Sequence, residues 1–302
     1  MSILPSVGHG RVTVPEILSR KKFIPGQQAF TERKITSVTA YDYPTARLVD
    51  EAGVDIVLVG DSLAMAVLGY QNTLPVTLDE MLHHTRAVRR GVHRALLVAD
   101  MPFGTFQNGA EEAVRNATRF VKEAGAEAVK IEGGERRMNL VGRLVEAEIP
   151  VMGHIGLTPQ SLHALGGFRV QGKTAEAAEA LVRDAQALAA AGAFSIVIEA
   201  VPREIAARIT ESVPVPTIGI GAGPECDGQV LVLSDLLGLT EGRSPKFARK
   251  YADLRETIRG AVAHYVDDVQ KGAFPSDAES YHLPAQASAP AAARDAVPAK
   301  RT

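Results

Sequence analysis

The chain has 302 residues, of which 46% are hydrophobic, so it can bury one large core; barrels of parallel strands commonly fill this length as a single domain. Its 33 Lys and Arg residues nearly balance 35 Asp and Glu residues, and a formal net charge of −2 offers no broad field for binding nucleic acid or an anionic membrane. The single cysteine, Cys226, excludes an internal disulfide, and no apolar run approaches the length of a membrane span.

The amino terminus places Pro5, Gly8 and His9 before any useful apolar stretch, which is not the pattern of a signal peptide. A low cysteine count also fits a reducing compartment. We therefore expect a cytoplasmic protein.

Short β-rich runs alternate with helical patterns along the chain, which predicts βα units and a parallel sheet. In chain order the runs are residues 35–42, 55–61, 95–100, 128–132, 150–155, 195–199, 215–220 and 230–235. Eight strands close a barrel of this type, so we predict the α/β class and a (β/α)8 TIM barrel. The last run is ambiguous, because its apolar residues could equally form a buried helix.

Helices are predicted between these runs. Asn108 can cap a helix that Gly125 ends, and residues 174–192 form another that is rich in Ala and Leu. Residues 247–269 also have a helical pattern and would cover the barrel or a neighbouring subunit.

The domain organisation follows from composition. We predict one catalytic barrel over residues 1–284, with a short amino-terminal lead. Residues 285–302 are rich in Ala and Pro and poor in large apolar groups, so we expect a disordered tail.

One pattern occurs three times: a helix-like run closes on Ala-Gly, an apolar run follows, and that run ends in an acid. The acids are Asp61, Glu132 and Glu199. Parallel strands of this kind are buried on both faces, so a charge at the carboxyl end is costly unless it belongs to a site. Barrel active sites lie at that end, where the strand-to-helix loops gather. The polar residues predicted there are Asp42, Asp61, Ser62, Asp100, Lys130, Glu132, His154 and Glu199.

Three of these acids come from consecutive strands and offer only oxygen ligands: Asp61, Asp100 and Glu132. Such a set suits Mg²⁺, with water and substrate oxygens completing an octahedron, better than it suits zinc. The alternative is that these acids simply pair with Lys130 and nearby arginines.

Lys130 has several possible roles. It could form a Schiff base with a carbonyl substrate, or remain charged and hold a carboxylate or enolate oxygen, or form only a salt bridge with Glu132. Glu199 is far in sequence from the predicted metal ligands, which would place it across the barrel mouth as a base. His154 could support substrate binding or be a hydrogen-bonded core residue.

Eight segments stand in the order and spacing of a known family. They are residues 40–43, 59–63, 74–77, 99–103, 129–134, 153–160, 166–172 and 219–223. Together they closely resemble the ketopantoate hydroxymethyltransferase family, over about Val12 to His282. One departure is Ala64, where the family usually has Gly. A methyl group there is expected to shift the loop that carries Asp61 and Ser62 and to slow turnover without abolishing it.

The resemblance implies a barrel of the phosphoenolpyruvate/pyruvate superfamily that binds Mg²⁺. It implies hydroxymethyl transfer from 5,10-methylenetetrahydrofolate to the small 2-oxo acid 3-methyl-2-oxobutanoate, an early step of pantothenate synthesis, and a homo-oligomer, usually a decamer. By position, the implied metal ligands are Asp61, Asp100 and Glu132. The implied oxo-acid-binding residues are Asp61, Ser62, Asp100 and Lys130, and the implied proton acceptor is Glu199.

Two other functions remain open. The chain could be another Mg²⁺-dependent aldolase or lyase of the same superfamily that acts on oxo acids without folate. It could also be a catalytically silent barrel that binds a metabolite, although carboxylates at several strand ends argue against that.

Overall fold

The structure is a computed structural model that describes residues 10–21, 33–242 and 245–283. The chain divides into two compact units, residues 1–252 and 253–302. The amino-terminal pattern around Pro5 to His9 and the predicted tail of residues 285–302 lie outside the described residues, and the single barrel domain over residues 1–284 stays a prediction.

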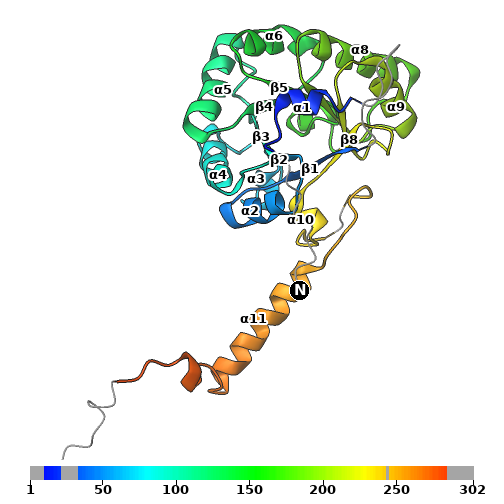
Figure 1. Ribbon diagram of the computed structural model, residues 1–302. Helices are drawn as coiled ribbons and strands as arrows, with labels where there is room; N and C mark the ends of the chain where they lie inside the picture. The colour runs from blue at the N-terminus through cyan, green and yellow to red at the C-terminus, as the bar shows by residue number, and fades with distance from the viewer. Residues whose placement is uncertain (1–9, 22–32, 243–244, 284–302) are drawn as a thin grey trace, which may run out of the picture. The chain divides into compact units, whose positions relative to one another are not determined.

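The first unit contains a closed barrel of eight parallel strands, in which each strand pairs with the next and the last pairs with the first (Figure 1). The strands are β1 (Ile35–Thr39), β2 (Ile56–Val59), β3 (Leu96–Asp100), β4 (Ala128–Glu132), β5 (Val151–Gly156), β6 (Ser195–Glu199), β7 (Thr217–Ile220) and β8 (Gly228–Leu231). The predicted (β/α)8 barrel is therefore confirmed.

Helices surround the strands in Figure 1. The longer ones of this unit are α2 (Tyr43–Glu51), α4 (Leu78–Gly91), α5 (Ala110–Ala124), α6 (Met138–Glu146), α8 (Ala175–Ala190) and α9 (Arg203–Ser212). Short helical segments are α1 (Val14–Leu18), α3 (Leu63–Ala66), η1 (Glu135–Arg137), η2 (Pro159–Ser161), α7 (Leu162–Leu165) and α10 (Leu233–Leu236). Local signals explain several ends: Thr77 and Glu80 form a capping box at α4, and Gly125 ends α5 with a left-handed backbone.

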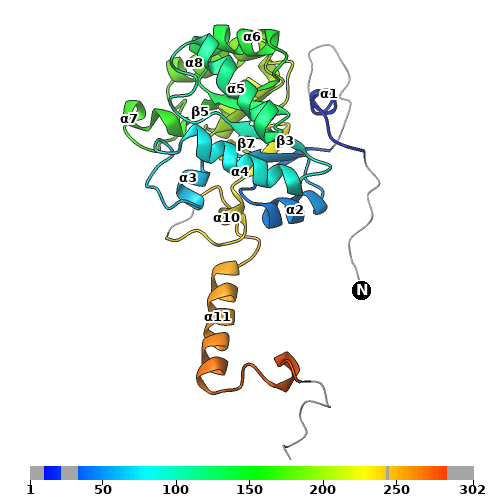
Figure 2. The ribbon, with the colours of Figure 1, turned by 90° about the vertical axis from the view of Figure 1, so that its left-hand side faces the viewer.

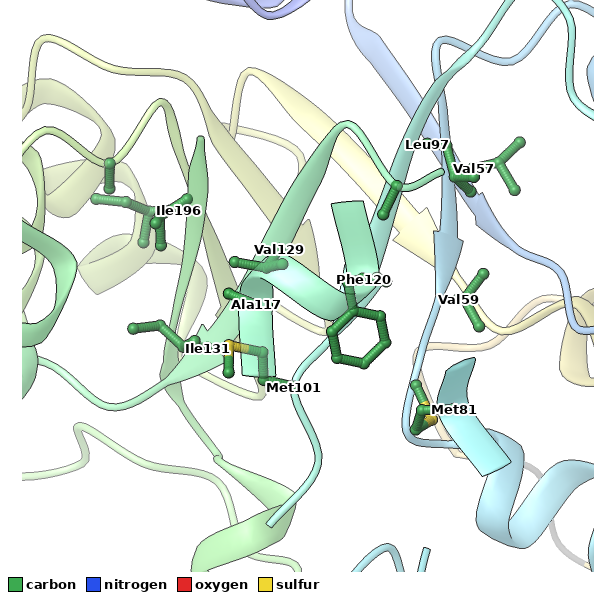
Figure 3. Packing of buried hydrophobic residues seen from close by; sticks show 14 of the residues in the cluster. Val57, Val59, Met81, Leu97, Met101, Ala117, Phe120, Val129, Ile131 and Ile196 are labelled. Atoms are coloured by element: carbon green, nitrogen blue, oxygen red, sulfur yellow. The ribbon is translucent and has the colours of Figure 1, made fainter. Parts of the chain in front are cut away.

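Alternation along each strand divides the core into two parts. Outward side chains such as Val129 and Ile131 pack on Ala117 and Phe120 of α5, as Figure 3 shows. Inward residues form a second cluster inside the barrel, which includes Ala128 of β4. Lys130 and Glu132 follow Ala128 at steps of two, so they point into the barrel near the carboxyl end of β4.

The opposite end of the barrel is closed by α1. Figure 2 shows α1 and α7 on opposite sides of the strands. Ile17 of α1 belongs to the inner cluster, and the chain that follows carries Lys21, whose Nζ donates to Thr210 O at 2.6 Å and lies 2.9 Å from Asp227 Oδ2. The amino-terminal segment is therefore bound to residues from the end of the barrel sequence.

Four sequence predictions need correction. The last strand is β8 at residues 228–231, and residues 233–235 of the predicted run 230–235 belong to α10, in which Leu233 and Asp235 are buried. Asp42 does not reach the site, since its Oδ1 caps α2 by accepting from Thr45 N–H. Gly109 rather than Asn108 precedes α5, and the helix predicted from residue 247 begins at Leu254.

The second unit contains α11 (Leu254–Gln270) and η3 (Asp277–Glu279). None of the residues of α11 is buried. Its exposed apolar side chains recur at helical spacing and are Ile258, Val262, Tyr265, Val266 and Val269. No helix in the described part of either unit is long and apolar enough to cross a membrane.

Candidate active site

A cavity of about 910 Å³ opens at the carboxyl ends of the strands. Its walls are largely apolar and include Leu58, Val197 and Ile220. Seven of the eight polar residues predicted at the strand ends line it, and Asp42 does not: the seven are Asp61, Ser62, Asp100, Lys130, Glu132, His154 and Glu199. An apolar cavity with a few convergent polar groups is the usual form of a small-molecule site.

Asp100 and Lys130 form the centre of the polar cluster. They are register neighbours on β3 and β4, and Lys130 Nζ lies 2.8 Å from Asp100 Oδ1. Both side chains are buried. Burial alone would lower the pKa of Lys130, but the carboxylates of Asp100 and Glu132 outweigh it and raise that pKa. Lys130 is therefore a cation, which favours the charged role over a Schiff base, because imine formation needs the neutral amine.

Asp61 follows β2 and is connected directly to Asp100, whose Oδ2 accepts the Asp61 backbone N–H at 2.9 Å. Burial, and then repulsion from Asp100 and Glu132, raise the pKa of Asp61 well above its ordinary value. Burial also raises the pKa of Asp100, against the opposing effect of Lys130. The cluster therefore holds more negative charge than its own side chains neutralise.

The loop between β2 and α3 places Ser62 at the cavity, where its Oγ lies 2.9 Å from Tyr41 Oη. Gly60 makes this approach possible, because a Cβ at that position would lie 2.7 Å from Ser62 Oγ. Ala64 is fully buried in the helical turn of α3, where its backbone N–H donates to Asp61 O.

His154 connects the two sides of the site. Its Nδ1 lies 3.2 Å from Lys130 Nζ and 3.4 Å from Glu132 Oε1, and its Nε2 lies 3.2 Å from Glu199 Oε2. Burial and Lys130 lower the pKa of His154, but the interactions with Glu132 and Glu199 outweigh both and raise it to about 9. When the His154 ring is protonated, each of its two N–H groups faces a carboxylate. When the ring is neutral, Nδ1 accepts from Lys130 and the hydrogen is on Nε2. In both forms, therefore, a hydrogen on Nε2 faces Glu199.

Glu199 ends β6, and the backbone around it has little freedom. Gly156 is its register partner on β5, with φ of +90°, and a Cβ there would lie 2.3 Å from Glu199 O. Ala200 follows with φ of +49°, a left-handed conformation that is unfavourable for a residue with a side chain. Strain of this kind persists where the surroundings fix the chain, which is common beside functional groups.

The carboxylates also bear on a possible cation site. In the described residues, no group of three or more His, Cys, Asp or Glu side chains forms a ready-made metal cage. Mg²⁺ does not need one, because it keeps several waters and is usually held by one or two carboxylates and the substrate. Glu132 Oε1 is buried, makes no ordinary hydrogen bond in the described residues, and lies 3.4 Å from His154 Nδ1. An oxygen of this kind, among buried carboxylates that repel one another, suits a hard divalent cation.

Sequence reasoning missed one buried polar residue of this cluster. Gln160, in η2 after β5, contacts both Asp61 and Glu132. It is the last residue of the segment 153–160, so its place in that segment was the available signal.

The chain is similar to known proteins over most of its length. Residues 23–277 match the family model described as ketopantoate hydroxymethyltransferase. The 3-methyl-2-oxobutanoate hydroxymethyltransferase of Koribacter versatilis is 59% identical over 289 residues, covering 96% of this chain and 95% of that protein. The protein of the same name from Syntrophobacter fumaroxidans is 56% identical over 273 residues, covering 90% of this chain and 94% of its own.

Among solved structures, the fold is similar to a phosphonopyruvate hydrolase in complex with oxalate and Mg²⁺, with a TM-score of 0.53 and 19% identity over 82% of this chain and 88% of that one. A phosphoenolpyruvate phosphomutase from Streptomyces platensis has a TM-score of 0.55 and 18% identity, over 87% and 88% of the two chains. At such identities the likeness shows the fold alone, and it agrees with the barrel described above.

Proposed function

The chain belongs to the ketopantoate hydroxymethyltransferase family, and from that membership we propose that it transfers a hydroxymethyl group from 5,10-methylenetetrahydrofolate to 3-methyl-2-oxobutanoate. The product is ketopantoate, an early intermediate of pantothenate synthesis. The observation that carries the proposal is the placement of Glu199 in the same cavity as the buried Lys130–Asp100 pair, with His154 between them. Such a cavity holds an oxo acid at one side and a base at the other.

The charge of the site supports a divalent cation. A 2-oxo acid is an anion, and it would enter a cavity in which Asp61, Asp100 and Glu132 already repel one another. Asp61, Asp100 and Glu132 would hold Mg²⁺, with a water between the ion and any carboxylate that does not reach it. When bound, the ion supplies positive charge to the carboxylate and keto oxygens of the substrate. The related phosphonopyruvate hydrolase structure, which holds oxalate and Mg²⁺, supports this choice.

The residues of the chain then have separate roles. Lys130 and Ser62 bind the oxo acid, and the Lys130 charge favours the negative oxygen that develops when C3 loses its proton. Glu199 takes that proton as the general base. His154 keeps an N–H toward Glu199 and so orients its carboxylate. The large cavity allows the folate to approach C3 from the open side.

The transfer itself makes one carbon–carbon bond and breaks two carbon–nitrogen bonds of the folate. The C3 carbanion forms a carbon–carbon bond with the methylene carbon of the folate, and one carbon–nitrogen bond of that methylene breaks. Water supplies the hydroxyl group as the second carbon–nitrogen bond breaks. The proton taken from C3 and one proton of that water end on the two folate nitrogens, which releases ketopantoate and tetrahydrofolate. A cavity of about 910 Å³ lies toward the upper end of the range for ligand sites, roughly 300 to 1,000 Å³, and has room for both substrates.

We also propose that the protein is a cytoplasmic homo-oligomer, a decamer as the family resemblance implies. The apolar side chains of α11 support association, because a helix of 17 residues with none of them buried gains stability by packing on another copy. Sedimentation of the full chain measures the assembly directly, and a monomer at micromolar concentration would contradict the proposal.

The decisive experiment is mass-spectrometric detection of ketopantoate from the two substrates, with Mg²⁺ and with excess chelator. Metal-dependent product supports the proposed reaction. If folded, Mg²⁺-loaded protein gives no product, a panel of other oxo acids without folate tests the alternative of an aldolase or lyase. Failure of divalent metal binding would instead favour a silent, metabolite-binding barrel.

A further inference from the structure

Gln160 makes four hydrogen bonds that connect the ends of four neighbouring strands. Its Nε2 donates to Asp61 Oδ2 at 2.9 Å and to Met101 O at 3.0 Å, and its backbone N–H donates to Glu132 Oε2 at 2.9 Å. Its Oε1 accepts from Gln107 Nε2 at 3.3 Å. The side chain is buried, with 7% of the residue exposed, so these bonds are not exchanged with solvent.

The orientation of the Gln160 amide is fixed by its partners. Met101 O and a carboxylate can only accept, so both hydrogens of the amide must face them. Gln107 is fixed in the same way, because its Oε1 accepts from Gly104 N–H at 2.8 Å and Phe106 N–H at 3.3 Å, which leaves its Nε2 to donate to Gln160. The loop after β3 therefore sets the direction of an amide that arises after β5.

Gln160 contacts only one oxygen of each of two carboxylates. It binds one oxygen of Asp61 and one oxygen of Glu132, through two separate donors. Glu132 Oε1, the second oxygen, makes no ordinary hydrogen bond in the described residues and lies 3.4 Å from His154 Nδ1. Fixing one oxygen of a carboxylate leaves the other in a defined direction, which is how residues behind a metal ligand orient it.

We propose that Gln160 is a positioning residue that holds the Asp61 and Glu132 carboxylates in place for the divalent cation and oxo acid. The inference rests on the proposed function and extends it to a residue that touches neither substrate. Gln107 acts one step further away, by holding the Gln160 amide in the orientation that donates to Asp61.

The experiment uses the full chain with Gln160→Met, Gln107→Met and, as a matched control, Gln186→Met on the exposed side of α8. Methionine keeps the length and volume of the side chain and removes its hydrogen bonds. In Gln160→Met the bonds to Asp61 and Met101 are lost, while the backbone N–H still donates to Glu132. Binding of Mn²⁺ is measured from the electron paramagnetic resonance signal of free Mn²⁺, without substrate or turnover. Exchange of the C3 proton of 3-methyl-2-oxobutanoate with deuterium is measured in parallel.

We expect Gln160→Met to raise the Kd for Mn²⁺ about tenfold or more, the usual effect of removing a partner of a metal ligand. Gln107→Met should have a smaller effect in the same direction, and Gln186→Met none. Raised Mn²⁺ concentration should recover much of the proton exchange of Gln160→Met, which a globally disturbed barrel would not do.

Wild-type affinity for Mn²⁺ in both Gln160→Met and Gln107→Met would overturn the inference. If Gln160→Met does not fold, Gln107→Met decides it alone. The proposed function fails separately, if the wild-type chain binds Mn²⁺ but forms no ketopantoate, and the comparison of variants can still be read in that case. A wild-type chain that binds no Mn²⁺ would overturn this inference together with the metal site.

Discussion

Lys130 and His154 contact one another inside the barrel, with 3.2 Å between Nζ and Nδ1. Two positive groups at this distance repel, but Glu132 and Glu199 face the two ring nitrogens and keep the pKa of His154 raised. Nε2 then carries the hydrogen that faces Glu199. His154 thereby connects the charged Lys130 on β4 with the proposed base, Glu199, two strands away on β6.

Replacing Lys130 with Met should lower kcat/KM by about 10²- to 10³-fold, because the developing oxygen charge loses its nearest fixed cation. The Kd for 3-methyl-2-oxobutanoate should rise as well. Steady-state kinetics and calorimetry measure both effects, and Lys122→Met on the exposed surface of α5 serves as the control. Trapping of a borohydride-reduced adduct in the wild-type protein would contradict this role and support a Schiff base.

Glu199→Gln should retain oxo-acid and Mg²⁺ binding and lose exchange of the C3 proton by about 10²- to 10⁴-fold, since the amide cannot accept that proton. Proton NMR of the substrate in deuterium oxide follows the exchange without folate. Glu204→Gln on α9 is the matched control. Exchange at the wild-type rate in Glu199→Gln would exclude it as the base.

Asp55, at the end of the barrel closed by α1, should make stability depend on pH. Burial opposes its ionisation, but hydrogen bonds from Thr36 and Arg20 outweigh burial and lower the pKa of Asp55. A lowered pKa in the folded state stabilises the protein above the unfolded-state pKa, about 3.9, and the stabilisation is lost as pH falls toward the folded-state pKa.

Asp55→Asn should therefore be less stable at pH 7 by about 3 kcal/mol, because the buried Arg20 loses its buried charge partner and keeps only the more exposed Glu16. The difference from wild type should shrink below about pH 4. Urea unfolding at several pH values measures this, with Glu179→Gln, from an exposed ion pair, as the control. A difference that is constant from pH 7 to pH 3 would contradict the prediction.

Ala64→Gly tests the one departure from the family pattern. Ala64 is in a helical turn and fully buried, and Asp61 O accepts its N–H, so the methyl group is accommodated without loss of that contact. We expect Gly to reduce the free energy of unfolding by about 1 to 2 kcal/mol, from backbone entropy and lost burial. Turnover should remain within about twofold of wild type. A severalfold gain in kcat would show instead that the methyl group slows the loop.

Periodicity and strand-end chemistry account for most of the fold. The runs at residues 128–132 and 195–199 agree with β4 and β6 to the residue, because each lies between a glycine turn and an acid. The hydrophobic pattern alone places the last strand too late, at residues 230–235 instead of 228–231. An apolar run of this length does not distinguish a strand from a buried helical turn.

The residues of the candidate site also fall into those that the sequence places and those that it does not. Residues that end strands, such as Asp100 and Glu132, could be placed from the sequence because barrel closure brings all strand ends together. Gln160 could not, because its contacts depend on the path of a loop and on a backbone N–H, which have no residue-type signature. The roles of the site residues in catalysis stay predictions for the experiments above.

The ion pair between Lys21 and Asp227 spans 206 residues of sequence. On a ribosome, Lys21 emerges long before its partner, and the strand that closes the barrel, β8, begins directly after Asp227. A nascent chain must therefore wait for almost the whole barrel before Lys21 can reach its charge partner. During that interval Ile17 and Arg20 can already find native partners from the first strands, so closure of this end of the barrel around Lys21 is a late step of folding.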